Sequence, residues 1–66
     1  MPTTYYSAQK AIEISLGVRG IAADAEDADF VSMIDGFIRT AERESYFLPE
    51  HDKRFALILE AYELTA

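Results

Sequence analysis

Apolar residues recur at helical spacing through most of the chain, and this pattern predicts three helices joined by short connectors. The clearest segment is the central one, in which Phe30, Ile34 and Phe37 follow one another every three or four residues. Asp24 is its expected N-cap, because carboxylates suit the positive end of a helix dipole. The segment ends before Pro49, since proline pushes the preceding residue out of the helical region. We therefore expect an amphipathic central helix.

The N-terminal segment fits two structures. From Ile12 to Val18 apolar and polar residues alternate as in a half-buried strand, which would have to pair with a strand of another chain. A helix accounts for more residues, with Thr3 or Thr4 as its N-cap and Gly17 or Gly20 at its end. The helix is favoured, and the intermolecular strand stays open. On the helix, seven apolar residues share one broad arc: Tyr5, Ala8, Ala11, Ile12, Ile14, Leu16 and Val18.

The third predicted helix runs from about Pro49 to Leu64, and apolar side chains cover an unusually wide part of it. Between Phe55 and Leu64 they span about 220° of the helix surface, whereas a helix in a small bundle buries a stripe a little over about 100° wide. Either the other helices wrap the third one on two sides, or a second chain covers the surplus. The residues expected at such a self-interface are Arg54, Leu57, Ala61 and Leu64.

The expected fold is all-α: a small antiparallel three-helix arrangement in a single domain, residues 1–66, completed by homo-oligomerisation, with a homodimer as the simplest form. The short connectors, residues 18–23 and 47–48, favour antiparallel neighbours. A chain of 66 residues buries only about 60% of the surface that its unfolded form exposes. Because the chain has no cysteine, neither disulfides nor a thiolate metal site can add stability.

Twelve acidic and six basic residues give a formal net charge of −6, which repels nucleic-acid phosphates and anionic lipid. We therefore expect no direct binding to nucleic acid and no membrane association. No apolar run approaches the length of a membrane span, and the N-terminus does not resemble a signal peptide, so a cytoplasmic location is expected. The charge either keeps the surface soluble or steers the protein to a partner with a basic surface.

The sequence contains only incomplete versions of catalytic and metal-binding motifs. His51 is the only histidine, and no serine or carboxylate accompanies it in a recognised catalytic arrangement. The acidic run from Asp24 to Asp29 superficially resembles a calcium-binding loop, but it lacks the required glycine and the alternating ligands. We therefore expect no enzymatic activity, no cofactor and no bound metal.

Leu16-Gly17-Val18 resembles the turn of a helix-turn-helix domain, which joins the supporting helix to the recognition helix. The resemblance implies that residues 22–29 would enter the major groove of DNA. That segment carries four carboxylates and no basic residue, so the sequence argues against sequence-specific binding of DNA.

Three features mark candidate surfaces for a protein partner. The acidic cluster offers carboxylates that could imitate a row of phosphates, and Gly36 sits in the central helix where alanine would be more stable by about 1 kcal/mol. Tyrosines combine a large contact area with a polar tip. The partner-binding candidates are Asp24, Glu26, Asp27, Asp29, Gly36, Tyr5, Tyr6 and Tyr46.

The expected function is that of a small acidic, non-enzymatic interaction protein, an inhibitor or regulator that binds a larger protein. Its size, charge and lack of catalytic motifs are similar to those of small phage-encoded proteins that block host machinery or defence enzymes. The alternative is a structural or assembly module that mainly joins copies of itself. Neutralising the acidic cluster would impair the first, whereas Leu57→Glu or Leu64→Glu would disrupt the second.

Overall fold

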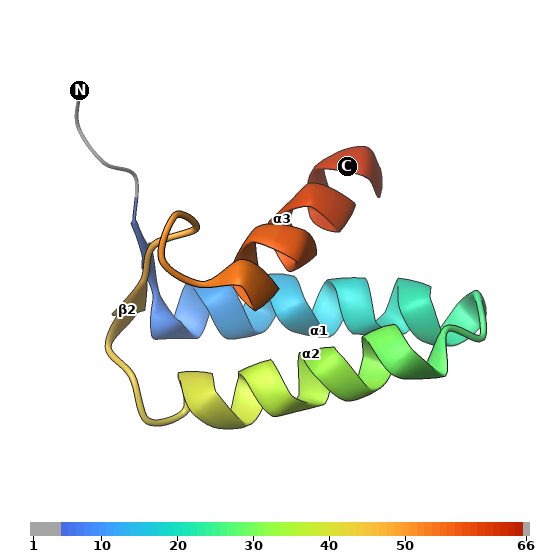
Figure 1. Cartoon of the computed structure of the whole chain (residues 1–66), viewed down its shortest axis with the longest axis horizontal. Coiled ribbons are helices and arrows are strands. Elements are labelled where there is room, and N and C mark those ends of the chain that lie inside the picture. The colour runs from blue at the N-terminus through green and yellow to red at the C-terminus, as the bar shows by residue number, and fades with distance from the viewer. Residues whose placement is uncertain (1–4, 66) are drawn as a thin grey trace.

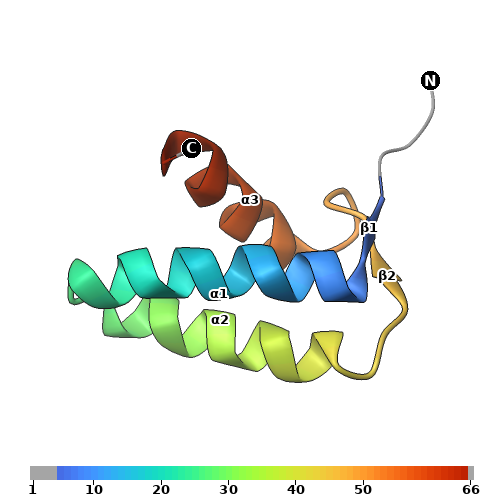
Figure 2. The same cartoon turned by 180° about the vertical axis from the view of Figure 1, so that it is seen from behind.

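The computed structural model describes residues 5–65 and contains three helices and a two-stranded ladder. In chain order these are β1 (Tyr6–Ser7), α1 (Ala8–Asp24), α2 (Ala28–Ala41), β2 (Tyr46–Phe47) and α3 (Lys53–Thr65). α1 and α2 form a long antiparallel hairpin, α3 crosses it at an angle, and the ladder lies at the end where α1 begins and α2 ends (Figures 1 and 2). The predicted helical fold class is confirmed, and the two short strands are an addition to it.

The N-terminal segment is a helix, so the strand alternative for residues 12–18 is wrong. α1 begins after Ser7, whose Oγ accepts a hydrogen bond from the backbone N–H of Lys10 at 3.2 Å. The predicted caps at residues 3 and 4 lie outside the described residues. The helix also runs through Gly17 and Gly20 instead of ending there, because its last turns bury Val18 and Ala22 in the core. Apolar burial outweighs the low helix propensity of the two glycines.

Asp24 is the last residue of α1, and the prediction that it caps the central helix is wrong. Asp27 performs this role: its carboxylate accepts a hydrogen bond from the N–H of Phe30 at 3.1 Å. The error follows from the misplaced end of α1, since a helix that continues to Asp24 moves the cap of α2 three residues further along the chain.

Glu26 reverses the chain between the two helices with a φ of 58°. Its N–H donates to the carbonyl of Ala23 at 3.1 Å, and the N–H of Asp27 donates to the carbonyl of Ala22 at 3.0 Å. This pair of hydrogen bonds is the Schellman pattern, in which the residue with positive φ is usually glycine. A glutamate therefore occupies a left-handed position that favours glycine.

The third helix begins at Lys53, so the expected placement of Pro49 in its first turn is wrong. Residues 49–51 form a turn instead, closed by a 3.0 Å hydrogen bond from the His51 N–H to the Leu48 carbonyl. The Asp52 carboxylate accepts from the N–H groups of Arg54, at 2.9 Å, and of the next residue, at 3.2 Å. Asp52 is thus the N-cap of α3, a role for which the sequence had suggested no residue.

The ladder joins two segments that lie far apart in the sequence. Tyr6 pairs with Phe47 and Ser7 with Tyr46 in antiparallel register, and the N–H of Ala8 donates to a carbonyl of the loop before β2 at 2.9 Å. The ladder therefore fixes the start of α1 beside the segment that follows α2. It also brings Phe47 into the core, where its side chain is 6% exposed.

Three phenylalanines form the centre of the core. The rings of Phe37 and Phe55 stack in parallel with centroids 5.4 Å apart, and Phe47 packs 4.8 Å from Phe37 and 5.8 Å from Phe55. They come from α2, α3 and β2, and α1 adds a row of small and aliphatic side chains. One continuous core therefore holds all three helices together. Its buried apolar residues are Ala11, Ile14, Val18, Ala22, Ile34, Phe37, Ala41, Phe47, Phe55, Ile58 and Leu59.

Candidate interaction surfaces

The structure separates the predicted partner-binding residues into two groups at opposite ends of the hairpin. The four carboxylates of the acidic cluster lie at the turn between α1 and α2, whereas the three tyrosines lie at the ladder (Figure 1). Gly36 belongs to neither group, because it sits in the middle of α2. The candidates therefore define separate surfaces and not one site.

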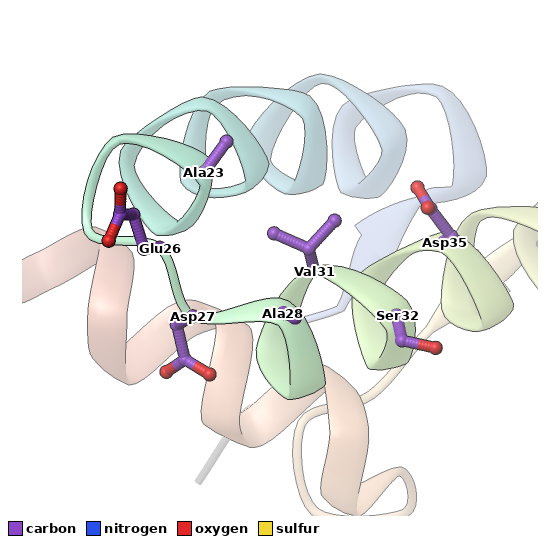
Figure 3. A pocket seen from close by; sticks show the side chains of 7 residues that line it. All are labelled: Ala23, Glu26, Asp27, Ala28, Val31, Ser32 and Asp35. Carbon is purple, nitrogen blue, oxygen red and sulfur yellow. The ribbon is translucent and has the colours of Figure 1, made fainter.

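A shallow hollow of about 440 Å³ lies at the turn end of the hairpin, and we call it the outer groove. Its rim carries carboxylates from the turn and from α2, and its floor is made of small apolar side chains; Figure 3 shows Val31 reaching from α2 towards α1. All of the lining residues come from α1, α2 and the turn between them. They are Ala23, Glu26, Asp27, Ala28, Val31, Ser32 and Asp35.

The outer groove and α3 lie on different sides of the hairpin. α3 meets α2 at Gly36 and Thr40, whereas the groove is lined by Val31 and Asp35. Gly36 follows Val31 by five residues, and Thr40 follows Asp35 by the same interval. The pair that meets α3 therefore lies about 140° around α2 from the pair that lines the groove. The face that lines the groove is therefore not the face that α3 covers.

Ala23, the groove residue that α1 provides, ends a row on one side of that helix at spacings of four, three and four, which we call the α1 outer row: Ile12, Leu16, Arg19 and Ala23. Leu16 belongs to the broad apolar arc that the sequence predicts for this helix, yet it is 55% exposed. Arg19 Nε donates to Asp35 Oδ1 at 2.7 Å across the two helices, with both side chains nearly half exposed. An exposed ion pair of this kind contributes about 0–1 kcal/mol to stability. The outer row thus combines apolar area with a partly accessible guanidinium group.

The tyrosine end consists of an exposed pair and one residue at the core's edge. Tyr5 is 67% and Tyr46 55% exposed, and their rings meet edge to face at 5.9 Å. Tyr6 is half-buried and packs against Phe55 at 5.2 Å. Tyr5 and Tyr46 therefore present an accessible aromatic surface, whereas Tyr6 has a structural contact within the chain.

Gly36 is half-buried on the side of α2 that α3 approaches. A Cβ atom at this position would lie 3.8 Å from Arg54 Nη1, which is ordinary van der Waals contact. The guanidinium of Arg54 also donates to Thr40 Oγ1 at 3.3 Å and lies 5.8 Å from the centre of the Phe37 ring. The close neighbour that the sequence suggested for Gly36 is thus an arginine of the same chain. Two predicted site residues, Gly36 and Arg54, meet each other.

The outward side of α3 carries an exposed row at the same spacing, which we call the α3 ridge: Lys53, Leu57, Glu60 and Leu64. Leu57 is 51% and Leu64 81% exposed, whereas Phe55, Ile58 and Leu59 on the opposite side are buried. Ala61 is half-buried at the edge of the core. α3 therefore turns one apolar face inward and leaves a second, narrower one uncovered by the rest of the described chain.

Within residues 5–65 we looked for groups that could take part in catalysis or bind a metal ion. His51 is exposed in the turn before α3. Between residues 5 and 65, no three histidine or carboxylate side chains gather as ligands for a metal ion. None of the three helices in this part of the chain has the length and apolar character needed to cross a membrane. Comparisons of the chain with protein-family models, with curated proteins and with solved structures gave no match.

Proposed function

We propose that the chain is a small acidic, non-enzymatic binding protein that inhibits or regulates a larger protein by occupying a basic surface on it. The kind that we favour is a phage-type protein directed at host machinery or at a defence enzyme. The observation that carries the proposal is the outer groove, because it combines an apolar floor with an acidic rim in a single concave surface.

The two parts of the groove have different roles in binding. Apolar side chains of a partner that cover the floor gain about 25 cal/mol per Å² of apolar surface removed from water. The carboxylates of Glu26 and Asp27 at the rim attract lysine or arginine, and the net charge of −6 accelerates the approach of a basic partner. The floor thus favours affinity, and the rim favours selection of a basic segment.

The test captures binding proteins from an extract of the cells that produce the chain. The immobilised bait is the wild type or the double variant Glu26→Gln/Asp27→Asn, in which asparagine keeps the cap of α2 while both charges are removed. A matched bait, Glu44→Gln/Glu50→Gln, loses two exposed carboxylates away from the groove. We expect a protein with a basic surface to be recovered by the wild type and the matched bait, to be lost with the groove variant, and to dissociate as salt rises.

Equal recovery by the groove variant would show that the rim does not bind the partner. Equal loss with both variants would show that only the bulk charge of the chain matters. In either case the groove is not the binding site.

The assembly module remains a second candidate because the α3 ridge leaves Leu57 and Leu64 exposed. Under this alternative, self-association is the function and no larger partner is needed. Leu57→Glu or Leu64→Glu would then abolish assembly, and the wild-type bait would recover no larger protein.

A further inference from the structure

Residues 5–65 form a convex and a concave surface on different sides of the molecule, and no other part of this range covers either. The α3 ridge points away from the core, since its residues lie about 180° around the helix from the buried Phe55, Ile58 and Leu59. The outer groove lies on the side of the hairpin that α3 does not cover. A ridge of exposed leucines and a groove with a floor of small side chains have the shapes that helix packing requires of two partners.

The apolar positions of the two surfaces have the same spacing. Leu57 and Leu64 are seven residues apart on α3, and Leu16 and Ala23 are seven residues apart on α1. Both pairs therefore span about 10.5 Å along their helices. If α3 of one copy lies antiparallel to α1 of another, Leu57 meets the small side chains around Ala23, and Leu64 meets the exposed Leu16.

The same alignment pairs opposite charges at both remaining positions. Lys53, one turn before Leu57, falls beside the rim carboxylates of Glu26 and Asp27, which follow the end of α1. Glu60, between the two leucines of the ridge, falls beside Arg19. Arg19 uses its Nε atom for the bond to Asp35 and keeps further N–H donors free for a second carboxylate. In the opposite orientation Glu60 would still fall beside Arg19, but Lys53 would lie beside Ile12 and lose its pairing with the rim carboxylates, so the charge of Lys53 favours the antiparallel alignment.

We propose that the α3 ridge of one copy docks into the outer groove of a second copy. Since ridge and groove lie on different sides of the chain, the contact is heterologous: each copy offers a free groove at one end and a free ridge at the other, and copies add head to tail. The inference holds whether or not a larger protein binds the groove. Where such a partner exists, self-association and partner binding exclude each other, because both use the same surface.

The test measures the mass of the purified chain by sedimentation velocity over a concentration series. Leu57→Glu blocks the ridge, and Ala28→Glu blocks the groove; both positions are exposed, and circular dichroism verifies that each variant is folded. Ser45→Glu adds the same charge at the ladder end as a control. We expect the wild type and the control to grow beyond dimers as concentration rises, and each blocked variant to remain at the monomer mass of 7.4 kDa with association weakened about tenfold or more.

Mixing the two blocked variants is the decisive step. The Ala28→Glu chain keeps its ridge and the Leu57→Glu chain keeps its groove, so an equimolar mixture should form a one-to-one pair and stop there. A wild type that stays monomeric overturns the proposal. A discrete dimer that both substitutions break and mixing does not restore also overturns it, because that result belongs to a two-fold symmetric interface.

Discussion

At the residue scale, Glu26 is the position where local preference and observed structure disagree most. Its φ of 58° lies in the left-handed region, which costs a residue with a Cβ atom about 1–2 kcal/mol relative to its usual conformation. Glycine would avoid this cost and is the common residue at this point of a Schellman turn. Glutamate at this position lowers the stability of the turn relative to glycine, but it places a carboxylate at the rim of the outer groove.

Replacing Glu26 by glycine should raise the free energy of unfolding by about 1 kcal/mol, because glycine adopts positive φ without steric cost. Urea denaturation of the wild type and of Glu26→Gly measures the change. Glu26→Ala is the control, since it removes the same carboxylate but keeps the Cβ atom. A glycine variant no more stable than the alanine variant would show that the turn carries no such strain.

At the element scale, helical periodicity predicted the central helix and the inner face of α3 but not where the helices begin and end. The core seam of α2 could be foreseen because Ile34 and Phe37 recur at one spacing. The end of α1 could not, because glycine signals a helix end only when the residues beyond it have nothing to bury. Val18 and Ala22 are buried in the core, and this burial depends on the tertiary structure. Because the predicted helix ended at Gly17 or Gly20, it did not include Ala23, and the α1 outer row could not be recognised from the sequence.

Gly17→Ala and Gly20→Ala should each raise the free energy of unfolding by about 0.5–1 kcal/mol, since both lie within α1 and a Cβ atom at either position meets no heavy atom within 4 Å. Thermal and urea unfolding measure the gain, and the two effects should add. A loss of stability in either variant would mean that α1 does not continue as a regular helix through that glycine.

Asp52 should be required for the start of α3. Asp52→Ala removes the acceptor of two backbone N–H groups and should lower the free energy of unfolding by about 1 kcal/mol. Asp52→Asn keeps a side-chain oxygen in place and should cost less than half as much. Equal losses in the two variants would assign the effect to the 3.8 Å ion pair with Arg54 and not to the cap.

At the scale of the whole molecule, the sequence predicted the helical class and a surplus of apolar surface on α3. It did not predict the ladder, because strands of two residues leave no periodic signal and form only when Tyr6 and Phe47 are brought together by the hairpin. It also grouped the acidic residues with the tyrosines, since spatial separation along a long hairpin is invisible without the fold. The outer groove arises from two helices in contact, so its apolar floor could be recognised only in the structure.

Docking of the α3 ridge into the outer groove of a second copy is tested most directly by the amide chemical shifts of the ¹⁵N-labelled chain in a dilution series. We expect the signals of Ala23, Ala28 and Val31 in the groove and of Leu57 and Leu64 on the α3 ridge to shift together as concentration rises. Signals of the ladder should remain unchanged. Shifts confined to the tyrosine end, or no shifts at any concentration, would contradict the docking of one copy on another.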